Sequence, residues 1–366
     1  MISIADIINF LETKAPLALQ ESYDNAGLVC GNRMLACSGA IAALDLTEQV
    51  LEEAIDKKFN LVIVHHPPIF KPLKSLEPRD AITKLLLKAI KHDIAVYAIH
   101  TNLDNVVWGV NGKIARRVGL QKACVLAPMQ HTHQKLAVFV PVDHAEKLSN
   151  ALFEAGAGSI GHYSECSFTS EGNGSFKPMK GSQPFIGAEG MREKVVEAKI
   201  EVIFPVHLQP KILAVMHENH PYEVVAYDIL PLENKFSSFG GGIVGELKEP
   251  MQVDEFLSLL KLRFQTGTIR HNSVPGKSIQ KVAFCGGSGK LLINNALVSK
   301  VDAFVTSDLT YHDFFLPEGK MLLADIGHFE SEQFTSDLLV EILNEKFPTF
   351  AVLKTAHKTN PVNYFL

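Results

Sequence analysis

The segment FNLVIVHHPPIF, residues 59–70, shows where an apolar strand ends in a polar cluster. Its apolar run leads directly into His65 and His66, and Pro67 and Pro68 then end the strand. A strand that is apolar on both faces is typical of a parallel sheet with helices on both sides. The two imidazoles are either a ligand pair or part of a turn, and this segment alone leaves both interpretations open.

The chain around this segment alternates apolar strands with amphipathic helices. The pattern predicts strands over residues 39–47, 60–66 and 94–101 and helices over residues 48–58 and 80–93. The same rhythm returns late in the chain, with strands predicted over residues 281–289, 302–308, 320–328 and 349–356. Such alternation indicates βαβ units. We therefore expect an α/β fold with two related halves.

The middle of the chain has a different order of elements. A strand (135–142), a helix (143–156), a polar hairpin (163–178), a strand (197–206), a helix (208–220) and a last strand (223–232) are predicted. This βαββαβ order is that of a ferredoxin-like unit. We expect residues 1–130 and 235–366 to form one discontinuous α/β domain, interrupted by an inserted domain over residues 131–234.

Composition limits the class of protein. The 366 residues are 46% hydrophobic and 20% charged, with a net charge of -5, which fits a globular chain and favours no nucleic-acid partner. The N-terminus lacks the basic start of a signal peptide, and no apolar run reaches the roughly 18 residues of a membrane span. Five widely spaced cysteines without a C-x-x-C motif fit a reducing compartment. We expect a cytoplasmic protein without a membrane partner.

Four clusters of histidine and carboxylate lie where predicted strands end: His65/His66, His100/Asp104, Asp308/His312 and His328/Glu332. A single His-x₃-carboxylate pair is more often a helix cap or a surface ion pair than a metal site. Ends of parallel strands, however, meet at one edge of a sheet, where ligands bind. Imidazole and carboxylate are ligands of Zn, Mn, Fe, Co and Ni. This number of groups exceeds the need of one ion and favours two metals that share a carboxylate.

The glycine-rich segment CGGSGK offers a second candidate site. It follows a predicted strand and opens a helix, so the amides of Gly286, Gly287, Ser288 and Gly289, together with Lys290, are candidates for binding a phosphate. The spacing is not that of a P-loop. Close packing of strand and helix explains the glycines equally well, and both interpretations stay open here.

Several motifs together resemble those of the Nif-three-like family (NGG-one-interacting factor three), whose members carry the label GTP cyclohydrolase 1 type 2 homolog. The motifs are ESYDNAGL (21–28), VHHPPIFKPLKSL (64–76), HTNLDNVVWGVN (100–111), GGSGK (286–290), DAFVTSDLTYHDF (302–314) and DIGHFESE (325–332). They cover nearly the whole chain in order. The inserted HENHPYEVVAYDIL (217–230) resembles the HPYE strand of CutA-like and PII-like domains, as in longer bacterial members.

The resemblance implies a particular set of ligands for two divalent metal ions, with zinc as the leading candidate and Fe, Mn, Co or Ni as alternatives. The implied ligands are His65, His66, Asp104, His328 and Glu332. It leaves His100, Asp308 and His312 outside the ligand set, where they would orient ligands. It also implies a toroidal homohexamer, a trimer of dimers.

Two functions follow from these features. The first is a metal-dependent hydrolase acting on a nucleotide-like, phosphate-bearing or cyclic amide substrate, in which Glu330, Asp308 or His100 moves protons. The alternative is a non-catalytic ring that senses, stores or delivers metal or regulates a partner. Threading of DNA through such a ring is disfavoured because the acidic net charge leaves no basic stripe. The sequence selects neither the substrate nor the partner.

Overall fold

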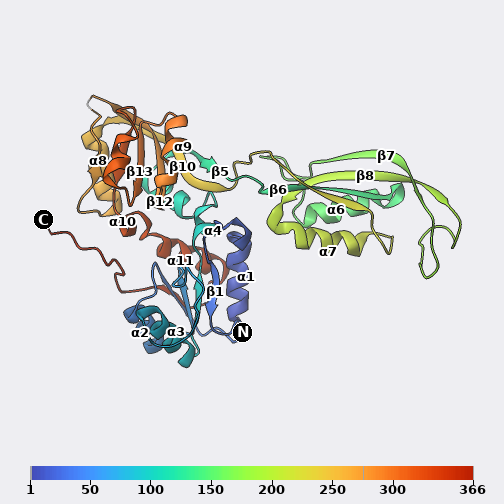
Figure 1. The fold of residues 1–366 in the computed structure, drawn as a ribbon, viewed down its shortest axis with the longest axis horizontal. Coiled ribbons are helices and arrows are strands. Elements are labelled where there is room, and N and C mark those ends of the chain that lie inside the picture. The colour runs from blue at the N-terminus through green and yellow to red at the C-terminus, as the bar shows by residue number, and fades with distance from the viewer. Residues whose placement is uncertain (1, 275, 366) are drawn as a thin grey trace. The chain divides into compact units, whose positions relative to one another are not determined.

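The chain forms two compact units. The computed structural model describes residues 2–274 and 276–365. Unit 1 consists of Met1–Met129 and Ser237–Leu366, and unit 2 consists of Gln130–Phe236. Figure 1 shows that unit 2 is one continuous segment, which follows β5 (Gln121–Pro128) and precedes β10 (Gly240–Gln252). The mixed α/β class expected from the sequence is present, with three sheets among the described residues.

The first sheet of unit 1 has five strands in the order β1-β4-β3-β2-β15. Their bounds are β1 Gly27–Cys30, β2 Ala40–Ala43, β3 Leu61–Val64, β4 Ala95–Ala98 and β15 Val352–Lys354. β1 is antiparallel to β4, and the other strands are parallel. All residues of β2, β3 and β4 are buried. Their unbroken apolar sequence follows from this, because both faces of the sheet are covered.

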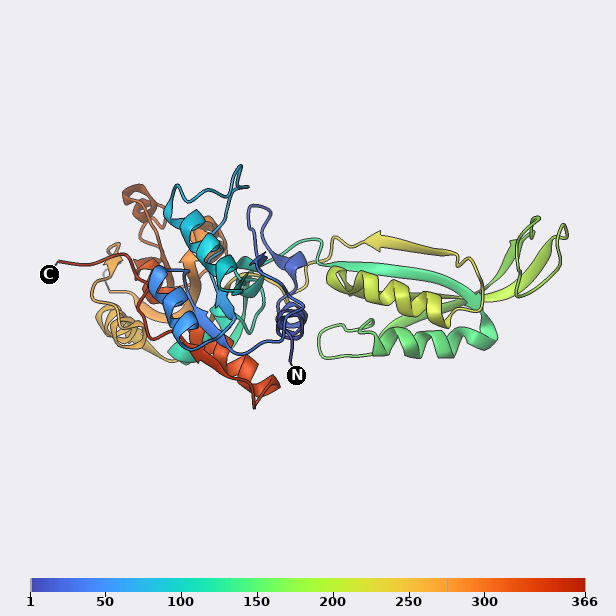
Figure 2. The same cartoon turned by 90° about the horizontal axis from the view of Figure 1, so that it is seen from below.

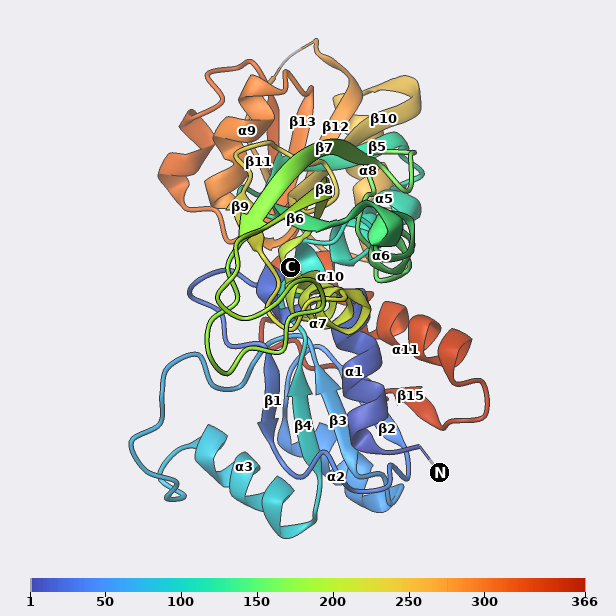
Figure 3. The same ribbon diagram turned by 90° about the vertical axis from the view of Figure 1, so that its right-hand side faces the viewer.

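Helices cover the two faces of this sheet (Figure 3). They are α1 Ile4–Lys14, α2 Glu48–Asp56, α3 Ala81–Lys91 and α11 Thr335–Lys346. Ile41 and Val62 pack in one cluster with α2 and α3, whereas Ala42 and Ile63 pack in another cluster with α1 and α11. Thr47 caps the start of α2, as expected for a side-chain oxygen at this position.

The second sheet of unit 1 has six strands in the order β11-β14-β13-β12-β10-β5. The further bounds are β11 Arg270–His271, β12 Ser278–Ser288, β13 Ala303–Ser307 and β14 Leu322–Asp325. β12, β13 and β14 are parallel, and β10 pairs antiparallel with both β12 and β5. The sheet is therefore mixed, with its parallel part toward the end of the chain.

The two halves of unit 1 share one hydrophobic core. The remaining helices are α5 Val110–Val118, α8 Val253–Phe264 and α9 Ile293–Val298, with short 3-10 turns at η1 Leu17–Leu19, η3 Lys290–Leu292 and η4 Tyr311–Phe315. Phe256 and Phe264 of α8 pack with Phe284 of β12 in a buried cluster that also contains Ile63 and Tyr97 of the first sheet. Because the cluster is continuous, the two sheets are held as one body.

Unit 2 is a four-stranded antiparallel sheet with two helices. Its elements follow as β6 His133–Pro141, α6 Val142–Glu154, β7 Ser167–Phe176, β8 Glu193–Pro205, η2 Val206–Leu208, α7 Gln209–Asn219 and β9 Tyr227–Pro231. The strand order is β7-β8-β6-β9. Leu148 of α6 and Ile212 of α7 pack on Leu136 and Val138 of β6, so both helices lie on one face (Figure 2).

One local prediction in unit 2 is wrong. Residues 163–178 were expected to form a polar hairpin, but they contain the single strand β7, whose partner is β8. The glycines at 172 and 174 lie within the strand and not at a turn. Among the helices that the structure describes, none is both long and apolar enough to cross a membrane.

Candidate metal centre

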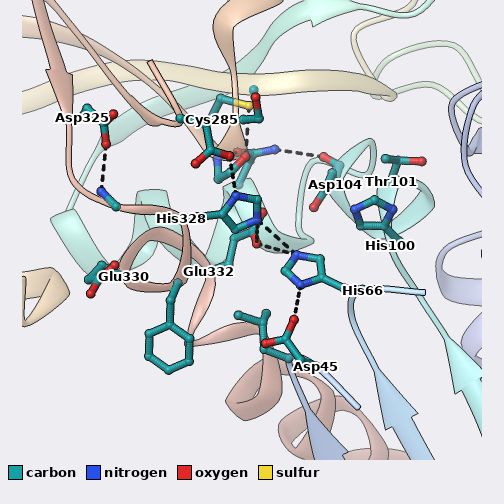
Figure 4. A pocket seen from close by; sticks show the side chains of 18 of the residues that line it. Asp45, His66, His100, Thr101, Asp104, Cys285, Asp325, His328, Glu330 and Glu332 are labelled. Carbon is teal, nitrogen blue, oxygen red and sulfur yellow. Dashed lines mark hydrogen bonds and ion pairs between the residues drawn. The ribbon is translucent and has the colours of Figure 1, made fainter. Parts of the chain in front are cut away.

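Strand ends from both sheets of unit 1 bring the histidines of three segments to one place (Figure 4). His65 and His66 follow β3, and His100 follows β4 directly before the short helix α4 Thr101–Asp104. His328 and Glu332 are the first and last residues of α10 His328–Glu332, which follows β14. Residues four apart on a helix lie on the same face. Asp104 and Glu332 are the last residues of the short helices that follow β4 and β14, so both lie near the carboxyl ends of these strands.

Glu332 lies between two groups of possible ligands, and each of its oxygens faces one group. Its Oε1 lies 3.8 Å from His65 Nε2, which in turn lies 3.6 Å from Asp104 Oδ1. Its Oε2 lies 3.0 Å from both His66 Nε2 and His328 Nε2. Each oxygen of Glu332 therefore faces a separate group of possible ligand atoms.

The orientation of the imidazoles shows which ring nitrogen is available to a cation. Each Nδ1 points at an oxygen acceptor: His65 at Ile99 O (2.8 Å), His66 at Asp45 (2.8 Å), His100 at Asp24 (2.8 Å) and His328 at Asp308 (2.7 Å). A carbonyl or an ionised carboxylate only accepts, so Nδ1 carries the proton. Nε2, the nitrogen that binds a metal once it is deprotonated, is then directed into the site, as in metal-binding histidines.

Two buried atoms in the first group fit a bound cation. Among the described residues, His65 Nε2 and Asp104 Oδ1 have no hydrogen-bond partner. Buried polar atoms without partners are rare because each costs about 1–3 kcal/mol. The two atoms lie 3.6 Å apart, and His65 Nε2 also faces Glu332 Oε1. A cation between them would remove this cost, so the donor set fits a divalent metal.

The second group brings two imidazole nitrogens together beside one carboxylate oxygen. His66 Nε2 lies 3.2 Å from His328 Nε2, and both face Glu332 Oε2. Burial lowers the pKa of each imidazole, but hydrogen bonds to carboxylates outweigh it and raise the pKa of His66 to about 9 and that of His328 to about 11. Protons thus occupy the place that a metal cation would take in this group.

The two carboxylates respond in opposite directions to the same surroundings. Burial and the charge of Glu332 raise the pKa of Asp104 well above its usual range. Burial also disfavours the charge of Glu332, but the surrounding imidazoles hold its pKa well below the usual range. Two carboxylates enclosed this closely repel each other unless a positive charge separates them.

The glycine-rich segment leaves room for the side chain of Glu332, and three of its backbone amides are not free to bind an anion. Gly286 and Gly287 lie within β12 and not at the start of a helix. The amides of Gly286, Gly287 and Gly289 already donate to Asn111, Ser331 and Thr306. At Gly287, φ is +61° and an added Cβ would lie 3.1 Å from Glu332 Cδ. The glycine allows the carboxylate to approach the backbone.

Of the remaining phosphate candidates, Lys290 is paired with a carboxylate. Lys290 Nζ lies 2.8 Å from Asp313 Oδ1, and this hydrogen bond lowers the pKa of Asp313 to about 2. Ser288 lines the cavity, but Lys290 does not. Three amides of residues 286–290 and the Lys290 ammonium group thus have partners within the protein, and phosphate binding at this segment stays a prediction.

The catalytic candidates have three different positions. The ring nitrogens of His65, His66 and His100 lie within 4.8 Å of one another, so His100 borders the first cation position. Asp308 orients His328. Glu330 is 7% exposed and lines the same cavity. His312 is exposed on η4, makes an edge-to-face contact with Tyr311 and is not among the residues that line the cavity.

Sequence reasoning missed two residues that hold the histidines, Asp24 and Asp45. Asp45 follows β2, so the rule that pointed to the other strand ends also applies to it. Asp24 lies in a loop before β1 and also accepts hydrogen bonds from Thr101. Its only signal was its place in the quoted motif ESYDNAGL, since its contact with His100 spans 76 residues of sequence.

A cavity of about 1070 Å³ opens onto this cluster of histidines and carboxylates, and all of its lining residues belong to unit 1. Aromatic side chains form part of its wall: Tyr23, Phe70, Phe329 and Tyr364. Arg270 is the only lysine or arginine among the described lining residues, and it is paired with Asp325. The rest of the lining consists of carboxylates, imidazoles, and uncharged polar and apolar residues.

Known proteins resemble the chain over its whole length. The family described as Duf34/NIF3 (NGG1p interacting factor 3) matches residues 2–361. A Bacillus subtilis protein named GTP cyclohydrolase 1 type 2 homolog is 38% identical over 98% of this chain and 97% of its own. A Halalkalibacterium halodurans protein of the same name is also 38% identical, over 98% of both chains. The crystal structure of a Bacillus cereus protein related to NIF3 has a TM-score of 0.86 at 37% identity and covers 100% of this chain and 99% of its own.

Proposed function

The chain belongs to the Duf34/NIF3 family, and from this premise we propose that it is a dinuclear metal-dependent hydrolase. The single observation that carries the proposal is Glu332, whose two oxygens face two separate groups of acceptor atoms. His65 and Asp104 would hold one divalent ion, and His66 and His328 would hold the other. Glu332 would contribute one oxygen to each ion. Zinc suits these ligands, as do Fe, Mn, Co and Ni.

Two such ions would supply Lewis acidity, which polarises a substrate carbonyl or phosphoryl group and lowers the pKa of water. The protein contributes orientation and proton transfer. Asp45 and Asp308 fix the rings of His66 and His328. His100 Nε2 faces the centre because its Nδ1 donates to Asp24. His100 is therefore placed to accept a proton from the attacking water, and Glu330 is placed to return one to the leaving group.

The charge of the cavity limits the substrate. A nucleotide-like or phosphate-bearing molecule would meet one arginine, which Asp325 already pairs, and several carboxylates. Its phosphates would have to bind at the ions themselves. A cyclic amide would instead place its ring against Tyr23, Phe70 or Phe329. We propose hydrolysis of a nucleotide-like, phosphate-bearing or cyclic amide substrate, and the weak cationic lining favours substrates with few negative charges.

The test combines metal analysis with turnover. Protein purified without added metal should contain about two transition-metal ions per chain, and His66→Ala should lose one of them. His100→Gln should keep both ions but lose turnover against whichever nucleotide, phosphodiester or cyclic amide the parent hydrolyses. His312→Gln, an exposed histidine outside the cavity, is the control. A metal-loaded parent that turns over no member of the three classes would refute hydrolysis.

A second candidate is a non-catalytic ring that senses or delivers metal. It is supported by unit 2, which contributes no residue to the described lining of the cavity and has the β6-α6-β7-β8-α7-β9 order of a ferredoxin-like domain. We propose that unit 2 is such a domain and that the chain assembles as a homohexamer. Light scattering should then give six times the 40.3 kDa of one chain. A sensor would change partner affinity with metal load and would show no turnover.

A further inference from the structure

The segment after β15 forms part of the cavity wall although it has no regular secondary structure. It starts at the first sheet, where Thr355 N donates to Ala42 O (2.9 Å). Farther along, Asn360, Pro361, Val362 and Tyr364 line the cavity. We call residues 355–365 the strap. It extends from the first sheet of unit 1 to α10 of the second half, where its contacts are with Phe329 and Glu330.

One residue of the strap supports a histidine of the proposed centre through a carboxylate. Thr359 Oγ1 donates to Asp45 Oδ2 at 2.7 Å. The other oxygen of Asp45 accepts from His66 Nδ1 at 2.8 Å. A carboxylate held only by the imidazole could rotate about its own bonds, whereas one that is held at both oxygens cannot. Thr359 thereby restricts the direction in which His66 Nε2 points.

The next residue of the strap has a different contact. Asn360 Nδ2 donates to Glu330 Oε1 at 3.1 Å, and Asn360 Oδ1 accepts from Val362 N at 3.0 Å. Glu330 is not among the groups that face the two cation positions. Thr359 and Asn360 are therefore neighbours on the same strap, but only Thr359 is linked to a proposed ligand.

We propose that Thr359 is a positioning residue of the metal centre: through Asp45 it fixes His66 and so retains the ion that His66 and His328 would hold. The inference rests on the proposed dinuclear centre but not on hydrolysis. It distinguishes the two ions, because His65 is oriented by the backbone carbonyl of Ile99 and, among the described residues, forms no hydrogen bond with the strap. Loss of the Thr359 hydroxyl should affect one ion only.

The experiment measures release of metal and not activity. The parent and variants are loaded with Co²⁺, transferred to excess chelator, and followed by their visible absorption. Thr359→Val should accelerate release of one of two ions roughly tenfold, the lower end of the effect of losing a group that orients a ligand. Thr359→Ser keeps the hydroxyl and should restore the parent rate. Asn360→Ala, on the same strap, should leave both rates unchanged.

A double-mutant cycle tests the route through the carboxylate. Asp45→Asn should accelerate the same phase, and Thr359→Val should add nothing in the Asp45→Asn background, since coupled residues are not additive. Equal acceleration of both phases, or a Thr359→Ser variant as fast as Thr359→Val, would overturn the role of Thr359. A parent that binds fewer than two Co²⁺ ions would instead overturn the dinuclear centre and this inference with it, whereas absent turnover affects only the hydrolase proposal. Thermal unfolding of each variant verifies that it is folded.

Discussion

Replacing Gly287 with alanine should remove metal from the centre while leaving the protein folded. The added Cβ would overlap with Glu332 Oε1 and would lie 3.1 Å from Glu332 Cδ and 3.3 Å from His328 Cε1. Favourable contacts between carbon atoms lie at about 3.5–4.0 Å, so the Glu332 carboxylate must retreat by roughly 0.5–1 Å. Functional constellations tolerate displacements of about 0.5 Å. Because Glu332 faces both groups of acceptors, the change should lower the affinity for both ions.

The expected loss of stability has two parts, one from the backbone conformation and one from the contact with Glu332. Alanine at a left-handed position costs about 1–2 kcal/mol, and overpacking in a filled site costs about 1–3 kcal/mol more. Gly119 provides the matched control, since its φ is +84° and an added Cβ meets nothing within 4 Å. Gly119→Ala should show the backbone cost alone. The difference between the two variants isolates the contact with Glu332.

The assay is urea unfolding of metal-free protein together with titration of metal into each variant. Gly287→Ala should unfold more easily than Gly119→Ala and bind metal at least roughly 100-fold more weakly than the parent, the upper end of the effect of losing an outer hydrogen-bond partner. Gly119→Ala should bind metal as the parent does. The reasoning is refuted if Gly287→Ala binds two ions with the parent's affinity.

Three further outcomes are expected. At pH 7 the metal-free protein holds protons on His66 and His328, whose pKa values are about 9 and about 11. Metal binding must release these protons, so the apparent affinity for metal must fall as the pH falls. Calorimetry in two buffers of different ionisation enthalpy should count at least about two released protons, and a count of zero would contradict the assignment. Asp308→Asn should weaken one ion by roughly 10–100-fold in chelator competition because it loosens His328, whereas the exposed His312→Asn should have no effect. Phe256→Ala should lower the free energy of unfolding, measured in urea, by about 3–5 kcal/mol. Leu262 lies on the same helix with its side chain 74% exposed, so Leu262→Ala should change this free energy little. Equal effects of the two substitutions would show that the shared core is described incorrectly.

The elements that position the site were predictable because their signals are local. The apolar runs of β2, β3 and β4 mark buried parallel strands, and polar residues that follow such strands meet at one edge. The same reasoning applied to β2 would have found Asp45. The structure brings His65, His66, Asp104, His328 and Glu332 together, and their role as metal ligands stays a prediction.

Prediction from sequence was weakest where long-range partners decide the outcome. The amides of the glycine-rich segment look free in sequence, but they donate to Asn111, Ser331 and Thr306, which are distant in the chain. The sequence of β7 resembles a hairpin because it contains polar residues and glycines, which are typical of turns. Its partner is instead the separate strand β8. Thr359 gave no signal at all, since its contact with Asp45 spans 314 residues.

The position of unit 2 in the chain has a consequence for the order of folding. Met129 N donates to Phe239 O at 2.9 Å, so β5 and β10 pair across an interruption of more than a hundred residues. Within unit 2, β6 and β9 also pair, and Leu232 N donates to His133 O at 3.1 Å. If unit 2 folds first, the loop that β5 and β10 must close becomes roughly tenfold shorter, which lowers the entropy cost by about 2 kcal/mol. The inserted unit thus acts as a preformed turn for the sheet that carries the proposed metal centre.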